Sequence, residues 1–154
     1  MTRPTIRYRA GYKYQLAEDY EIQTDVLPAR AVNADFIKMD LLGTLRIVAG
    51  YAWDGPSGPA QDTPDFMRAS LVHDALYQLM REGYLDPDLY RERADAILRT
   101  LCIEDGMPHA KAEFAYLAVR AFGKPSTDPK SEHPIIEAPG ITESPQDTGR
   151  TDPP

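Results

Sequence analysis

Residues 69–81 read Ala-Ser-Leu-Val-His-Asp-Ala-Leu-Tyr-Gln-Leu-Met-Arg, a largely apolar run that carries the polar groups of His73, Asp74 and Tyr77. Thr63, Pro64 and Asp65 precede this run and carry helix-start signals, an oxygen-bearing cap candidate and a proline in the first turn. No helix breaker follows before Gly83. The sequence therefore predicts one long helix, of about five turns, around which the fold is organised.

Helical spacing places His73 on the face that should point toward the core. At roughly 100° per residue it shares that face with apolar side chains, which are Phe66, Ala69, Leu76, Tyr77 and Met80. Asp74 lies at the flank of the face, and Tyr77 follows His73 by one turn. Two interpretations stay open: a core histidine bonded to a backbone carbonyl beside a solvated Asp74, or a functional site.

Two further helices are predicted downstream, over residues 86–104 and 108–122, because each begins with a proline-containing start signal. Asp95 lies at the edge of the apolar stripe of the first of them. It can turn inward to a partner on the preceding helix. Alternatively, it can form a surface ion pair with Arg91 or Arg99, each one turn away.

The first third of the chain alternates apolar and polar residues with a period of two, which is typical of strands. Residues 6–27 predict a hairpin with its turn at 17–19, and residues 36–51 predict a second hairpin around Gly43. We therefore expect a small antiparallel sheet ahead of the helices.

The segment 50–63 joins the two regions and is rich in glycine and proline. Such a loop exposes backbone carbonyls together with one carboxylate, Asp54, in a fixed geometry. A hard cation such as calcium requires oxygen ligands of this kind. The alternative is an ordinary connection between a strand and a helix.

Composition limits the classes of function. The chain has 154 residues, a formal net charge of −7 and a single cysteine, Cys102. The charge argues against binding to nucleic acid, and one cysteine excludes an internal disulfide framework. Neither a transmembrane segment nor a cleaved leader is predicted.

The domain organisation follows from the distribution of proline. Seven of the 14 prolines fall in residues 125–154, where almost no apolar pattern remains. We predict a single α+β domain at 1–123, with N-terminal antiparallel hairpins followed by three helices. Residues 124–154 are predicted to be a disordered, acidic, proline-rich tail.

Two resemblances arise from these motifs. The order of Asp54 in a glycine-rich loop, His73-Asp74-x-x-Tyr77 on one helix and Asp95 on the next resembles the helical core of phospholipase A₂, in its compact bacterial and viral versions. The stretches Tyr-Ala-Trp-Asp-Gly-Pro-Ser-Gly-Pro and His-Asp-Ala-Leu-Tyr are similar to signatures of an uncharacterised family of phage and prophage proteins.

The phospholipase resemblance implies a role for each matching residue. His73 would be the general base, Asp95 would accept the other imidazole N–H, and Tyr77 would brace Asp95. Asp54, Asp74 and a loop carbonyl at Gly55 would hold calcium, which polarises the ester carbonyl.

The phage resemblance implies a virion or accessory protein of the tail or particle, carrying a phospholipase-like calcium and His-Asp site. The alternative is an active calcium-dependent lipid hydrolase that acts on the host membrane. The expected partners are other phage structural proteins and phospholipid, with no nucleic acid. Synthesis is expected in the host cytoplasm, followed in the first case by association with the virion.

Overall fold

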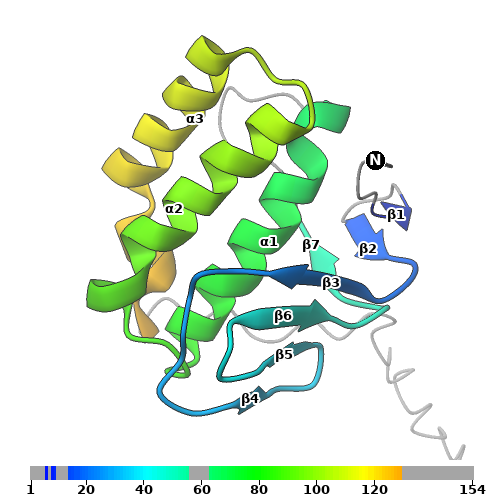
Figure 1. The fold of residues 1–154 in the computed structure, drawn as a ribbon, viewed down its shortest axis with the longest axis vertical. Coiled ribbons are helices and arrows are strands. Elements are labelled where there is room, and N and C mark those ends of the chain that lie inside the picture. The colour runs from blue at the N-terminus through cyan, green and yellow to red at the C-terminus, as the bar shows by residue number, and fades with distance from the viewer. Residues whose placement is uncertain (1–5, 7, 10–13, 56–62, 130–154) are drawn as a thin grey trace, which may run out of the picture.

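A computed structural model describes residues 6, 8–9, 14–55 and 63–129. Within these residues seven strands precede three α-helices and a short 3-10 helix, which confirms the predicted α+β class (Figure 1). The strands are β1 (Tyr8–Arg9), β2 (Tyr14–Leu16), β3 (Tyr20–Gln23), β4 (Val32–Asn33), β5 (Ile37–Met39), β6 (Thr44–Ile47) and β7 (Ala52–Trp53). The helices are α1 (Pro64–Arg81), α2 (Pro87–Glu104), α3 (His109–Phe122) and the 3-10 helix η1 (Lys124–Thr127).

The strands form two antiparallel sheets, with the orders β3-β6-β5-β4 and β1-β2-β7. The predicted hairpin around Gly43 is confirmed, because β5 pairs with β6 and Met39 lies opposite Leu45. Gly43 has a φ of 85°, and a Cβ at this position would lie 2.5 Å from the carbonyl oxygen of Thr24. This turn therefore requires glycine.

The other predicted hairpin is wrong, since β2 and β3 do not pair with each other. Instead, β2 pairs with β7 in one sheet and β3 pairs with β6 in the other. The two pairings share the same register, since Tyr14 lies opposite Trp53 and Tyr20 lies opposite Ile47. Residues 17–19 lie between these two pairings, at the passage from one sheet to the other, and do not reverse the chain. Asp19 holds this passage in place, because its carboxylate accepts hydrogen bonds from the Ala49 amide and the Arg46 guanidinium.

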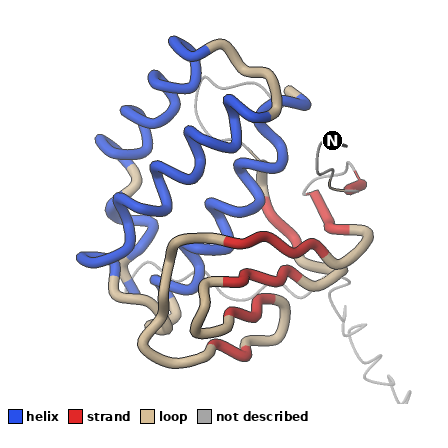
Figure 2. Tube along the Cα trace, in the orientation of Figure 1, coloured by secondary structure: helices blue, strands red, loops and turns tan. Residues whose placement is uncertain are grey.

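Helix α1 is the centre of the fold and is buried almost all round. Figure 2 shows it between the other helices and the strands. One direct tie to the strands is the Trp53 indole, which donates to the Ser70 hydroxyl at 3.1 Å. The helix starts at Pro64 and is followed by Gly83 at a φ of 82°, so the predicted limits are confirmed.

A buried cation joins α1 to the end of α2 and to the sheet. Arg68 is 3 % exposed. Its guanidinium donates to the carboxylates of Glu104 and Asp105 and to the hydroxyl of Tyr20. Because a buried guanidinium is costly without such partners, this cluster fixes the sheet, α1 and α2 relative to one another.

The predicted second and third helices are confirmed as α2 and α3. Helix α3 packs inward through small side chains, Ala112 and Ala115, while Phe114, Leu117 and Phe122 are more than half exposed. None of the helices in the described parts of the chain combines the length and the apolar character that a membrane span requires.

The described structure continues past residue 123, where the sequence predicted the domain to end. Helix η1 packs against α1, with Thr127 buried, and Arg81 donates to the Ser126 carbonyl at 2.9 Å. The pattern in 124–129 is too short and too rich in proline to signal burial. The rest of the predicted tail, residues 130–154, lies outside the described residues.

A chain that ends after Pro129 should therefore melt like the full chain, whereas a chain that ends after Gly123 should melt at a lower temperature. The longer truncation keeps Thr127 in place and keeps the carbonyl that accepts from Arg81. Thermal unfolding of the three chains followed by circular dichroism tests this expectation. Equal melting temperatures for both truncations would show that η1 contributes nothing to the domain.

Candidate functional site

Two consecutive helices bring together three of the residues that the sequence singled out. His73 and Tyr77 lie one turn apart on α1, and Asp95 faces them from α2. The Nε2 atom of His73 is 2.7 Å from Oδ1 of Asp95, and the Tyr77 hydroxyl donates to the same oxygen at 2.6 Å. Asp95 is fully buried, so the surface ion pair with Arg91 or Arg99 does not form.

The charge of Asp95 decides which nitrogen of His73 carries the proton. Burial opposes ionisation, but the hydrogen bonds from His73, Tyr77 and Arg120 outweigh it, so the pKa of Asp95 is lowered. Because the ionised carboxylate can only accept, Nε2 must be the protonated nitrogen in the neutral ring. The Nδ1 atom then carries a lone pair.

The lone pair of His73 points to the side of α1 that carries Asp74. Nδ1 is 4.0 Å from Oδ1 of Asp74, too far for a direct hydrogen bond. The side chain of Asp74 is 38 % exposed, yet burial of its carboxylate raises the pKa to about 6. The charges of His73 and Arg81 act against this rise, and the charge of Asp54 adds to it.

The other two predicted metal ligands lie at the end of β7. Asp54 is exposed and Gly55 is buried, with a φ of 75°. Asp54 is near enough to Asp74 for its charge to raise the pKa of Asp74. No group of three or more histidine, cysteine, aspartate or glutamate side chains could hold a metal in the described residues, so a cation here would depend on carbonyls and water. Residues 56–62 of the predicted loop lie outside the described residues.

Arg120 is a member of the site that the sequence did not reveal. Its guanidinium comes from α3 and donates to Oδ2 of Asp95 at 2.9 Å. Arg91 in turn donates to the carbonyls of Val119 and Arg120, which anchors this end of α3 to α2. In sequence, a cation in the last turn of a helix is explained by the helix dipole alone, so no signal marked Arg120.

Gly123 completes the enclosure of the site. A Cβ at this position would lie 2.6 Å from the Tyr77 hydroxyl and 2.5 Å from the Val119 carbonyl oxygen. Glycine therefore lets the end of α3 pass against Tyr77. The sequence indicated this residue as a helix terminator but not as a neighbour of the site.

Chemically, the arrangement is an imidazole with a fixed tautomer beside a carboxylate that is costly to ionise. Such an imidazole can accept a proton from water and return it to a leaving group. A hydrogen-bonded carboxylate behind the ring keeps the ring oriented and stabilises the imidazolium. Asp74, in contrast, has the chemistry of a ligand for a cation.

Replacing Arg120 by methionine should lower the free energy of unfolding by about 1–3 kcal/mol at neutral pH, because Oδ2 of Asp95 loses its donor. The pKa of Asp95 should rise toward the unfolded value of about 3.9. A lowered folded pKa stabilises above the unfolded value, and this stabilisation is lost as the pH falls through the folded pKa. The deficit of the variant should therefore shrink in acid.

Denaturant unfolding over a range of pH measures this effect. Arg93→Met is the matched control, since Arg93 forms an exposed ion pair with Asp25 and its loss should change the stability by less than about 1 kcal/mol. Equal losses in the two variants at every pH would contradict a special role for Arg120.

Comparison with known proteins places this site in a family. A search of curated proteins and a search of solved structures each find no match to the chain. The model of one family, described as a protein of unknown function (DUF1353), matches residues 32–119, more than half of the chain. The match runs from β4 into α3 and includes His73, Tyr77 and Asp95. The chain therefore belongs to DUF1353, a family of proteins of unknown function.

Proposed function

We propose that the protein hydrolyses a carboxylic ester of a lipid, with His73 as general base and calcium as cofactor. The observation that carries the proposal is the contact of His73 Nε2 with Asp95, 2.7 Å long, which leaves Nδ1 as the acceptor. Tyr77 and Arg120 hold Asp95 from its other sides. This support gives the imidazole one orientation and one tautomer, as general-base chemistry requires.

In the proposed reaction, Nδ1 of His73 takes a proton from a water molecule as the water oxygen attacks the ester carbonyl. The C–O bond to the alcohol then breaks, and the proton on Nδ1 passes to the leaving oxygen. The products are a carboxylic acid and an alcohol, and no covalent acyl-enzyme forms. Asp95 stays ionised throughout and stabilises the imidazolium.

Oxygen ligands around Asp74 support the choice of calcium. The pKa of Asp74 is raised chiefly because burial disfavours its charged form, with a smaller contribution from the charge of Asp54, and a bound cation would favour that charged form. Asp54, Asp74 and the Gly55 carbonyl form an all-oxygen set, which suits calcium better than zinc. When bound, calcium would polarise the ester carbonyl.

A second candidate is a purely structural role, favoured by the complete burial of Asp95 and by its donors on both α1 and α3. Buried polar networks of this kind hold helices together without chemistry. This role is compatible with the virion or accessory protein that the phage resemblance implies. The virion assignment stays a prediction, and mass spectrometry of purified particles tests it.

The hydrolase proposal predicts that His73→Gln abolishes turnover of a fluorogenic phospholipid and that Asp95→Asn reduces it strongly, because the tautomer is no longer fixed. His109→Gln is the matched control, since His109 is exposed at the start of α3. Its turnover should equal that of the wild type. Thermal melts of all four proteins separate lost chemistry from lost folding.

An inactive wild type at every calcium concentration would reject the hydrolase. In that case the structural role predicts that His73→Gln lowers the free energy of unfolding by about 1–3 kcal/mol, because Asp95 loses a buried partner.

The calcium proposal predicts a rise in melting temperature at millimolar calcium that is larger near about pH 7 than near about pH 5. Asp74 has a pKa of about 6, so it must lose its proton over this interval before it can bind a cation. Asp74→Asn should remove the rise. Asp25→Asn, at an exposed ion pair, should leave it unchanged. A calcium effect that is independent of pH and of Asp74 would place the ion elsewhere.

A further inference from the structure

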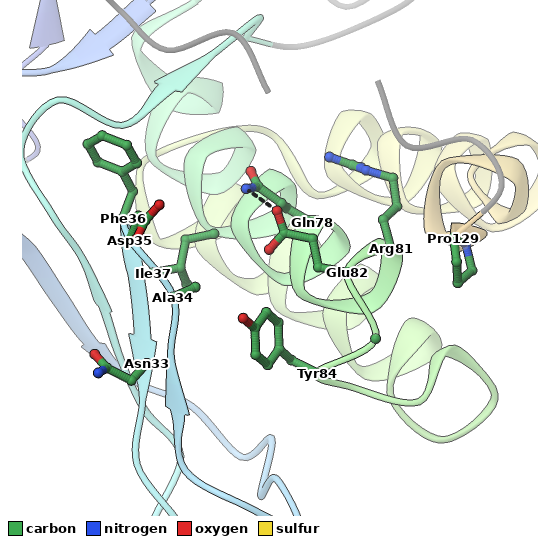
Figure 3. Close-up of a pocket in the computed structure, with 11 residues that line it drawn as sticks. Asn33, Ala34, Asp35, Phe36, Ile37, Gln78, Arg81, Glu82, Tyr84 and Pro129 are labelled. Carbon is green, nitrogen blue, oxygen red and sulfur yellow. Dashed lines mark hydrogen bonds between the residues drawn. The ribbon is translucent and has the colours of Figure 1, made fainter. Parts of the chain in front are cut away.

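A cavity of about 500 Å³ lies between the sheet and the end of α1 (Figure 3). One wall is the segment 33–37, which contains the turn from β4 to β5. The other wall is formed by residues of the α1 C-terminus, from Gln78 to Tyr84, and Pro129 contributes to the edge. Cavities that bind small ligands have volumes of roughly 300–1,000 Å³, so this one has room for a small molecule.

The cavity begins beside the candidate site. Gln78, which lines it, follows Asp74 by one helical turn, so the two side chains share a face of α1. Arg81, another lining residue, is near enough for its charge to act on the carboxylate of Asp74. A ligand in the cavity would therefore be a neighbour of the proposed reaction centre.

The walls of the cavity carry more negative than positive charge. Asp35 lies in the turn between β4 and β5, Glu82 directly follows α1, and among the described lining residues Arg81 is the one cation. The guanidinium of Arg81 donates to the Ser126 carbonyl, and Figure 3 shows it directed away from Tyr84. Glu82 is held in place by the amide of Gln78, which donates to its carboxylate at 3.0 Å.

The buried phenol of Tyr51 is subject to the same excess of negative charge. Burial raises the pKa of Tyr51, and the charges of Asp74, Glu82 and Asp54 raise it further, while Arg81 opposes them. The charges around this region therefore disfavour the binding of an anionic ligand. A ligand with a positive group is the complementary choice.

Tyr84 adds an aromatic face to the carboxylates. Tyr84 is 47 % exposed, and within the described residues neither its side chain nor that of Asp35 has a hydrogen-bond or ion-pair partner. Figure 3 shows the ring of Tyr84 beside Glu82 at the opening between the walls. An aromatic face next to carboxylates is the combination that recognises alkylated ammonium groups.

We propose that this cavity binds the ammonium group of a small organic cation, with Glu82 and Asp35 supplying the opposite charge and Tyr84 supplying a ring face. Because Gln78 already orients Glu82, little side-chain freedom is lost on binding. The proposal goes beyond the hydrolase, since binding of the cation requires no chemistry at His73.

Choline and its uncharged isostere 3,3-dimethyl-1-butanol test the proposal on the full chain. In a titration followed by NMR, choline should give saturable shifts of the Tyr84 and Glu82 amides, with a dissociation constant in the millimolar range, and the isostere should not. Glu82→Gln and Tyr84→Leu should each weaken choline binding by about fivefold or more. Glu21→Gln, on the exposed face of β3, is the control and should bind like the wild type.

Equal binding of the isostere, no saturation by choline up to about 50 mM, or unchanged affinity in Glu82→Gln would overturn the proposal. His73→Gln should bind choline normally, so failure of the hydrolase and failure of the cavity are separate results. Vesicles of phosphatidylcholine distinguish the source of the cation. Binding to vesicles that is lost in Glu82→Gln identifies a lipid headgroup, whereas binding to choline alone identifies a free cation.

Discussion

The helical layer depends on one buried carboxylate. Asp95 has no exposed surface, and an ionised carboxylate removed from water costs several kcal/mol unless donors surround it. Its donors come from both sides, His73 and Tyr77 from α1 and Arg120 from α3. Apolar packing alone would tolerate small shifts between these helices. The hydrogen bonds that His73, Tyr77 and Arg120 donate to Asp95 do not tolerate such shifts. The three helices therefore keep one relative position.

This constraint explains how α3 can pack through small side chains. Ala112 and Ala115 bury little apolar area, and the larger Phe114 and Phe122 face outward. The contact of Arg120 with Asp95 and the bonds from Arg91 to the α3 carbonyls supply the directional hold that this interface otherwise lacks. Arg68 plays the corresponding part at the other end of α2, where it binds Glu104 and Asp105.

The sequence predicted the parts of the site that depend on helical spacing. His73 and Tyr77 are one turn apart on a helix with clear limits, and Asp95 lies at the edge of the next apolar stripe, so a helix hairpin brings them together. Arg120 could not be predicted, because the contact depends on how α3 crosses α2.

The pairing of the strands was out of reach for a similar reason. Residues 17–19, Ala-Glu-Asp, have the composition of a turn. Their path is decided by Asp19, which binds Ala49 and Arg46 some 30 residues away in sequence. Local pattern shows that a strand ends, and only the long-range partner shows whether the chain then reverses.

The two carboxylates next to His73 differ in a way that bears on function. Asp95 is satisfied by its donors and has a lowered pKa, as a network that serves stability alone would have. Asp74 has a raised pKa, which means that the fold makes its charged form less favourable than water does. A polar residue without charge would avoid this cost at the same position. The ordered group of His73, Tyr77 and Asp95 therefore supports the proposed general base, and the Asp74 carboxylate, 4.0 Å from Nδ1 of His73, supports the proposed cation.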